Sequence, residues 1–227
     1  MNKSNIKIMI VNDKPELRNI IRNYLKDEGY TKLTVSENGL AALKRLQVDP
    51  VDLILADFAL PELNGLELLK KVRRDRNLED TPFILISAEG EQKYVAKAAE
   101  YGVSAFVVKP FSYQTLADKV NRILDRRINP TEVDLYYREA NQLAQSGNLE
   151  EALEKYRLAM ESTKDSMASL HYKIGRIHED MDRDKEAEDD YNEAVNMSGH
   201  YVNALDALGN IYLKHDRPEE ALRYLRR

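Results

Sequence analysis

Short apolar runs alternate with longer amphipathic stretches over the first half of the chain. The candidate strands are Ile6–Val11, Leu33–Val35, Leu53–Ala56, Phe83–Ile86 and Ala105–Val108. The stretches with helical period between and after them are Pro15–Glu28, Asn38–Gln47, Gly65–Arg74, Gln92–Tyr101 and Tyr113–Arg126. Because the strand-like runs are apolar throughout, we expect helices to cover both faces of their sheet. The alternation predicts an α/β domain with a five-stranded, parallel, doubly wound sheet.

The pattern changes after Asn129-Pro130, where no further strand-like run appears and the sequence keeps a helical period. Three units share one phase, marked by Ala152, Ala187 and Ala221 at spacings of 35 and 34 residues. This period resembles the tetratricopeptide repeat, a helix–turn–helix unit of about 34 residues. We therefore predict two domains, residues 1–127 and 131–227. The second is an all-α solenoid with repeats at about 133–166, 168–201 and 202–227, the last one incomplete.

The repeats depart from their family in a few places. Asp182 and Asp216 stand where glycine is usual at the turn. An ordinary helical bundle is the alternative, and we favour repeats because chance rarely produces three phased units. The third unit ends at Arg226-Arg227 without the capping helix that solenoids normally need for solubility. We therefore expect the chain to be part of a longer protein.

Composition narrows the range of partners. The chain is 43% hydrophobic and 32% charged, which is typical of a soluble protein with packed cores. Its net charge of −5 gives no reason to expect nucleic-acid binding, which normally requires a basic patch. The lack of cysteine excludes disulfides and thiolate metal sites. Neither a signal peptide nor a membrane-length apolar run is apparent, so we expect a cytoplasmic protein without membrane insertion.

Polar residues follow four of the five predicted strands. They are Asn12-Asp13 after the first strand, Asp57 after the third, Ser87-Ala88 after the fourth and Lys109-Pro110-Phe111 after the fifth. Sites in open parallel sheets form beyond these carboxyl ends. Taken singly, each residue is explained by a helix cap or a turn. Together they match the needs of phosphoryl transfer to a carboxylate: a nucleophile, acids that hold a divalent cation, and a lysine that stabilises the added charge.

These residues, with Asp57-Phe58-Ala59-Leu60-Pro61 and Asn64-Gly65, resemble the receiver domain of chemotaxis-type bacterial response regulators over about residues 4–127. The resemblance implies a flavodoxin-like fold and a role in a phosphorelay. Asp57 would accept the phosphoryl group from a sensor histidine kinase or a phosphotransfer protein. Mg²⁺ would be held by Asp13, Asp57 and the backbone carbonyl of Ala59, with Lys109 as the charge partner.

The same resemblance implies a switch. Ser87 would bind the phosphoryl group and move on activation, and Phe106 would change rotamer with it. The bond between Lys109 and Pro110 would be cis. The chain would promote its own phosphorylation and dephosphorylation, and no separate catalytic constellation points to an enzyme acting on another substrate.

Asn12 departs from the family, which normally has two acids after the first strand. An amide oxygen is a weaker ligand than a carboxylate for a hard cation. We expect Asn12 to reach Mg²⁺ through a water molecule and the affinity for Mg²⁺ to be lower than with two acids. The alternative function is a phosphorylation-independent scaffold with a degenerate receiver domain. Asp13, Asp57, Ser87 and Lys109 favour the phosphoacceptor.

The repeat resemblance implies a groove that binds a segment of another, unknown protein. The alternative is that some of the residues assigned to this groove are merely exposed polar positions. The repeat phase places six residues on the groove: Tyr137, Asn141, Tyr172, Arg176, Asp206 and Asn210. The last predicted helix of the receiver leads directly into the repeats. We therefore expect phosphorylation to control protein–protein interaction through them.

Overall fold

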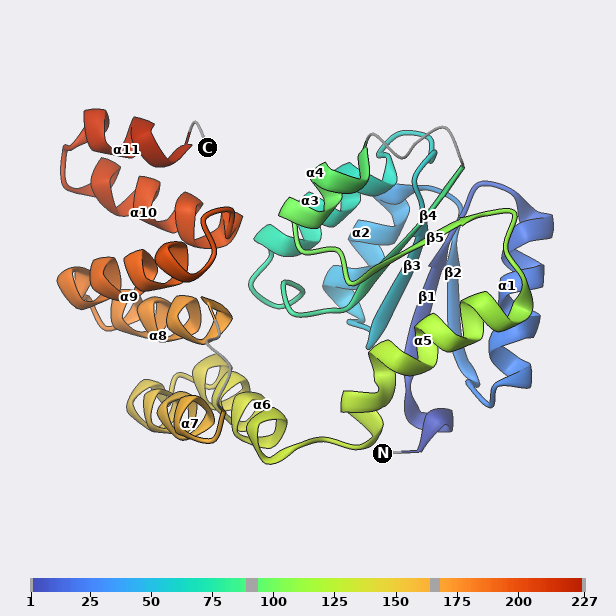
Figure 1. Ribbon diagram of the computed structural model, residues 1–227, viewed down its shortest axis with the longest axis horizontal. Coiled ribbons are helices and arrows are strands. Elements are labelled where there is room, and N and C mark those ends of the chain that lie inside the picture. Colours follow the sequence, from blue (N-terminus) through green and yellow to red (C-terminus); the bar gives the residue numbers. More distant parts are fainter. Residues whose placement is uncertain (1, 89–93, 164–167, 226–227) are drawn as a thin grey trace. The chain divides into compact units, whose positions relative to one another are not determined.

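The computed structural model describes residues 2–88, 94–163 and 168–225 (Figure 1). It divides into two compact units, Met1–Asn129 and Pro130–Arg227. The strands of the first unit are β1 (Lys7–Val11), β2 (Lys32–Ser36), β3 (Leu53–Asp57), β4 (Phe83–Ala88) and β5 (Ala105–Lys109). Its helices are α1 (Pro15–Asp27), α2 (Gly39–Val48), α3 (Gly65–Arg74), α4 (Val95–Glu100) and α5 (Tyr113–Ile128), after a 3₁₀ turn at Lys3–Asn5.

The five strands form one parallel sheet in the order β2-β1-β3-β4-β5. Helices α1 and α5 pack on one face, and α2, α3 and α4 pack on the other (Figure 1). All five residues of the central strand β3 are buried, which explains its uninterrupted apolar sequence before Asp57. The prediction of a five-stranded, doubly wound α/β domain is confirmed.

Helix α3 illustrates how the sequence forms these elements. The side chain of Asn64 accepts a hydrogen bond from the backbone N–H of Glu67 (2.9 Å) and so caps the helix N-terminus. Leu68, Leu69 and Val72 then fall on one face, and none of the three is exposed to solvent. Burial of each such side chain contributes about 1.5–3 kcal/mol to folding.

Helix α4 is shorter than the predicted Gln92–Tyr101, and Gln92 lies outside the described residues. The helix ends at Glu100 because Gly102 takes φ of 67°. The N–H of Val103 then returns to the carbonyl of Ala98 (3.0 Å), which closes the C-terminus. Gly102 can adopt this left-handed conformation without a Cβ clash.

A polar network around Glu28 ties α1 to α5. The carboxylate accepts hydrogen bonds from the amide of Asn121 (2.8 Å), from the Tyr113 hydroxyl and from the Lys3 ammonium (3.0 Å). The buried Tyr30 hydroxyl donates to the other end of the Asn121 amide (2.9 Å). These hydrogen bonds lower the pKa of Glu28 from 4.5 to about 2, and the one from Asn121 has the largest effect.

We expect this network to make the stability of the first unit pH-dependent. Because folding lowers the pKa of Glu28, its stabilisation is complete above about pH 4.5 and is lost as the pH falls towards 2. Glu28→Gln should cost about 1–2 kcal/mol at pH 7 and little at pH 2. Urea unfolding at several pH values measures this. The exposed Glu100→Gln is the control, and equal costs of Glu28→Gln at pH 7 and pH 2 would contradict the prediction.

The second unit contains six helices within its described residues. They are α6 (Glu132–Gln145), α7 (Leu149–Glu161), α8 (Ala168–Asp180), α9 (Asp184–Met197), α10 (Val202–Lys214) and α11 (Pro218–Leu225). Small residues let helices approach closely: a Cβ on Gly175 would lie 2.8 Å from the Tyr191 ring, and one on Gly209 would lie 2.6 Å from Leu225. The prediction of an all-helical second half is confirmed.

The turns explain the two aspartates that replace glycine. Asp182 and Asp216 have φ of 57° and 56°, and Gly147 has φ of 82° at the same place in the first repeat. Aspartate tolerates this left-handed region better than most residues with a Cβ. The turn geometry is therefore kept without glycine.

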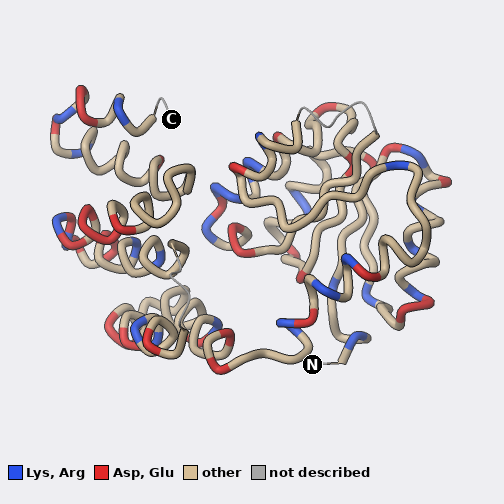
Figure 2. The backbone as a smooth tube through the Cα atoms, in the orientation of Figure 1, with Lys and Arg blue, Asp and Glu red and all other residues tan. Residues whose placement is uncertain are grey.

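Charge is divided unevenly between the two units. Residues 1–129 contain 21 Lys and Arg against 18 Asp and Glu, and residues 130–227 contain 13 against 21. Acidic positions are frequent along α9 in Figure 2. The first unit is thus slightly basic, and the second accounts for the negative charge of the chain. None of the described helices is long and apolar enough to cross a membrane.

Candidate functional site

The candidate site lies at the carboxyl ends of the central strands. Strand β3 ends at Asp57, which is paired in register with Ile86 of β4, one residue before Ser87. On the other side, Ala56 pairs with Val11 of β1, one residue before Asn12. The parallel register therefore places the polar residues that follow each strand at the same edge of the sheet.

The buried carboxylate of Asp57 accepts hydrogen bonds from three donors. Only 2% of the residue is exposed. Its Oδ2 accepts hydrogen bonds from the ammonium of Lys109 and from the amide Nδ2 of Asn12 (2.5 Å), and its Oδ1 accepts one from the N–H of Ala59 (3.1 Å). A buried charge is costly unless it is paired and hydrogen-bonded, and here it is both. The structure brings together four of the predicted residues.

The orientation of the Asn12 amide is fixed by its surroundings. Its Oδ1 accepts the backbone N–H of Lys14 (2.8 Å), which can only donate, so its Nδ2 must face Asp57. Its backbone is held as well, since its N–H donates to the carbonyl of Ser36 (3.1 Å) and its carbonyl accepts from Arg18 (2.5 Å). Asn12 is fully buried and presents a neutral donor to the carboxylate, where a second acid would present an oxygen.

Ser87 and Phe106 lie on the neighbouring strands. Ser87 is 2% exposed, and its Oγ has no hydrogen-bond partner among the described residues. Such orphaned hydroxyls are rare in folded proteins, and a ligand that supplies an acceptor is one explanation. Phe106 is half-buried and packs against the cluster beneath α3 and α4. The bond between Lys109 and Pro110 is cis, as the resemblance implied.

The donor set for a cation is small. Asp13 is exposed next to the buried Asn12, and Ala59 is exposed two residues after Asp57. In the described part of the chain, no three histidine, cysteine, aspartate or glutamate side chains gather as a metal site. Two carboxylates and one backbone carbonyl nevertheless suit Mg²⁺, which keeps several waters and needs few protein ligands. The residues present therefore fit this cation.

Sequence reasoning missed two features of the site. The guanidinium of Arg18 reaches the carbonyl of Asn12 from helix α1. Phe58, directly after Asp57, stacks on Tyr94 with ring centroids 4.7 Å apart. Neither pairing has a sequence signal, because each joins residues without a characteristic spacing.

The six predicted groove residues have different environments. Tyr172 is buried, and its ring packs near Tyr191 and Tyr201. The guanidinium of Arg176 lies over the Tyr172 ring (5.8 Å). The ring of Tyr137 lies 5.7 Å from that of Tyr156, and Asn141 accepts a hydrogen bond from the Tyr156 hydroxyl (2.7 Å). Asp206 is half-buried, and Asn210 is exposed.

Comparisons with known proteins find relatives of both units. The family model of the response regulator receiver domain matches residues 8–121, and two tetratricopeptide repeat models match residues 168–201 and 204–227. Chemotaxis protein CheY-3 of Vibrio cholerae is 36% identical over 122 residues, which cover 54% of this chain and 94% of the relative. The chemotaxis protein CheY of Pseudomonas aeruginosa is 36% identical over 121 residues, 53% of this chain and 98% of its own.

Solved structures show the same fold for the first unit. The signal receiver domain of a signal transduction histidine kinase from Syntrophus aciditrophicus aligns with a TM-score of 0.51 and 28% identity. The alignment covers 56% of this chain and 94% of that one. The receiver domain of the Francisella response regulator 1452 aligns with a TM-score of 0.50 and 28% identity, over 54% of this chain and 99% of that one.

Proposed function

The chain belongs to the response regulator receiver family, with tetratricopeptide repeats after the receiver, and on that premise we propose that Asp57 accepts a phosphoryl group in a phosphorelay. The donor is a sensor histidine kinase or a phosphotransfer protein. The observation that carries the proposal is the buried Asp57 carboxylate at the end of β3, paired with the ammonium of Lys109. A carboxylate held in this way is preorganised as a nucleophile.

The chain's residues support each part of the transfer. One carboxylate oxygen of Asp57 attacks the phosphorus, the bond from phosphorus to the donor's imidazole nitrogen breaks, and that nitrogen keeps the electron pair. Lys109 stabilises the negative charge on the transferred group, and the unpaired hydroxyl of Ser87 is available to bind one of its oxygens. The side chain of Asn12 holds the carboxylate in position.

Mg²⁺ would be held by Asp13, Asp57 and the carbonyl of Ala59. When bound, it neutralises charge on the phosphoryl oxygens. Asn12 would contribute only through water, because its amide nitrogen faces the carboxylate. Asp13 would then supply the carboxylate besides that of the phosphoacceptor.

The test is incubation of the full chain with Mg²⁺ and acetyl phosphate, followed by intact mass measurement. We expect one acid-labile phosphoryl adduct on the wild type and none on Asp57→Asn. Asp52→Asn is the matched control, since this aspartate directly precedes β3, at the opposite end of the strand from Asp57, and should leave the adduct unchanged. Failure of the folded wild type to form the adduct would favour the alternative, a phosphorylation-independent scaffold.

Replacing Asn12 by aspartate is expected to tighten Mg²⁺ binding about tenfold, because a carboxylate takes the place of a neutral donor. Calorimetric titration of both proteins with MgCl₂ measures the change directly. Asn19→Asp, an exposed position on α1, controls for the added negative charge. Equal dissociation constants for wild type and Asn12→Asp would contradict the expected weakness of the wild-type site.

The repeats are proposed as the output of the phosphorelay, in the cytoplasm, through binding of a segment of another protein. Helix α5 ends at Ile128, and α6 begins at Glu132, so the connection is short. Hydrogen exchange with and without beryllofluoride tests the coupling. We expect changed protection in α6, and no change in any repeat helix would contradict it.

A further inference from the structure

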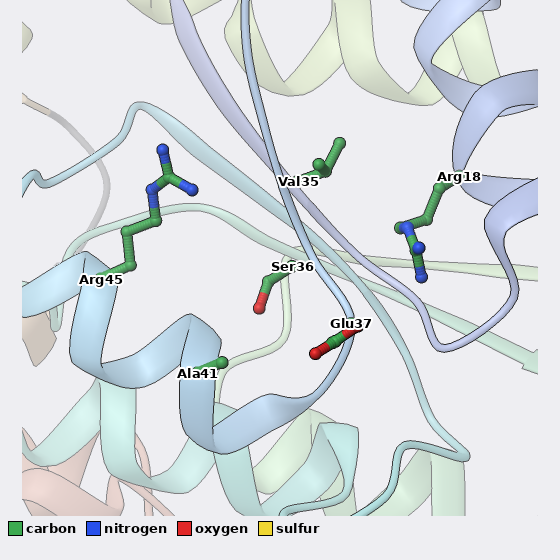
Figure 3. A pocket seen from close by; sticks show the side chains of 6 residues that line it. All are labelled: Arg18, Val35, Ser36, Glu37, Ala41 and Arg45. Atoms are coloured by element: carbon green, nitrogen blue, oxygen red, sulfur yellow. The ribbon is translucent and has the colours of Figure 1, made fainter.

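A cavity of about 280 Å³ opens beside strand β2, and its lining residues Arg18 and Ser36 both contact Asn12 of the Asp57 site. It is lined by Arg18 of α1, by Val35, Ser36 and Glu37, and by Ala41 and Arg45 of α2 (Figure 3). Pockets for cofactors and drug-sized ligands are usually about 300–1,000 Å³ and mostly apolar. This one is at the lower limit and carries three charged side chains, so it suits the side chains of a short segment better than a cofactor.

Strand β2 forms the edge of the sheet and pairs only with β1 in the described part of the chain. The carbonyl of Ser36 accepts the N–H of Asn12 (3.1 Å), so Ser36 directs its backbone groups towards β1. Because successive residues of a strand alternate, Val35 directs its N–H and C=O to the open edge. Val35 is 38% exposed. An unpaired edge of this kind is a template for a further strand.

The two arginines lie on opposite faces of this edge. Arg18 belongs to α1, which covers one face of the sheet, and Arg45 belongs to α2, which covers the other. Figure 3 shows their side chains on either side of β2. Arg18 uses one guanidinium N–H for the carbonyl of Asn12 (2.5 Å), and within the described residues its other donors remain for a ligand.

We propose that the open edge of β2 binds an extended segment of a partner protein that carries two adjacent acidic residues. Neighbouring side chains of an added strand point to opposite faces of the sheet. Two adjacent acids therefore place one carboxylate near Arg18 and the other near Arg45. Backbone hydrogen bonds to Val35 supply affinity, and the arginines supply specificity.

Charge supports an acidic partner. The cavity lining holds two arginines and one acid, Glu37, and the receiver unit as a whole has an excess of basic residues. Adjacent acids also occur within the repeats, at Glu150-Glu151, Glu179-Asp180, Glu188-Asp189-Asp190 and Glu219-Glu220. These lie in helices α7, α8, α9 and α11 and cannot pair as strands while those helices are folded. The occupant is therefore a segment of another protein.

Two labelled peptides of identical composition test the proposal on the full chain. The probe is Thr-Val-Asp-Glu-Val-Thr, and the comparison peptide is Thr-Asp-Val-Glu-Val-Thr, whose acids point to the same face. Fluorescence anisotropy should show the probe binding about tenfold more tightly, since one charge-assisted hydrogen bond is lost in the comparison. Amide signals of Leu33–Glu37 should shift in the nitrogen–proton spectrum when the probe binds.

Variants locate the two charges. Arg18→Gln and Arg45→Gln should each lower the affinity for the probe about tenfold. Their exposed neighbours Arg22→Gln and Lys44→Gln should leave it unchanged. Equal affinity for the two peptides, no binding of either, or affinity unaffected by both pocket variants would overturn the proposal. The peptide comparison uses the wild type and does not depend on the folding of any variant.

Discussion

Replacing Lys109 by alanine is expected to slow phosphoryl transfer to Asp57 by about a hundredfold. Lys109 is the only side-chain cation that the described structure places on the Asp57 carboxylate. Loss of one preorganised donor to a developing charge typically costs 10²- to 10³-fold in rate, and we take the lower figure because Asn12 and the N–H of Ala59 remain. Timed reaction with acetyl phosphate and separation of the phosphorylated form on a phosphate-binding gel gives the rate.

Lys109→Arg keeps the positive charge and should fall between the wild type and Lys109→Ala. Lys97→Ala removes an exposed lysine of α4 and should react at the wild-type rate. Thermal melting establishes that each variant is folded at the assay temperature. A Lys109→Ala rate within twofold of the wild type would remove Lys109 from the proposed mechanism.

Gly65→Ala is expected to destabilise the receiver unit by about 3 kcal/mol, at the upper end of the usual range for overpacking. A Cβ on Gly65 would lie 2.3 Å from the backbone oxygen of Asp57 and 2.8 Å from the Leu85 side chain. The Gly65 N–H also donates to the carbonyl of Phe58 (2.9 Å), so α3 cannot move away without breaking this bond. The backbone of the phosphoacceptor Asp57 must therefore shift.

Chemical unfolding followed by circular dichroism measures this cost, and the phosphorylation assay should show a slower reaction in the same variant. Gly199→Ala is the control, because a Cβ there meets nothing within 4 Å. If Gly65→Ala were as stable as Gly199→Ala, the close approach of α3 to the end of β3 would not constrain Asp57. A stable variant with slow phosphorylation would instead point to a local shift of the site.

Most of the receiver fold was predictable because its signal is local. Each apolar run is short, is bounded by polar residues and is followed by an amphipathic stretch, and this pattern defines repeated βαβ units. The polar residues at the strand ends were predictable for the same reason: Asp57 and Lys109 are the last residues of their strands, and Asn12 directly follows its strand. The parallel register then brings them together.

The orientation of side chains within the site was not predictable. The contact of Asn12 with a metal-bound water stays a prediction, whereas the hydrogen bond from its amide nitrogen to the Asp57 carboxylate was not foreseen. That orientation depends on the N–H of Lys14, two residues further along, and on a folded turn. Arg18 reaches the same residue from the next helix, and only the packing of α1 on the sheet determines this distance.

The repeat phase was predictable from small residues, but the exposure of individual groove positions was not. Tyr172 was placed on the groove by counting, and its ring is buried among other tyrosines. A periodic count fixes which side of a helix a residue occupies. The neighbouring repeat decides how much of the side chain remains accessible.

The two apolar clusters of the repeat unit meet at helix α8. Leu170, Ile174 and Ile177 of this helix pack with α6 and α7, whereas Tyr172 packs with α9 and α10. Linear arrays of this kind unfold in segments, since each repeat is stabilised only by its neighbours. Amides of α10 and α11 should therefore exchange through partial openings that leave α6 and α7 intact. We therefore expect a partner that binds one segment of the repeat unit to stabilise that segment first.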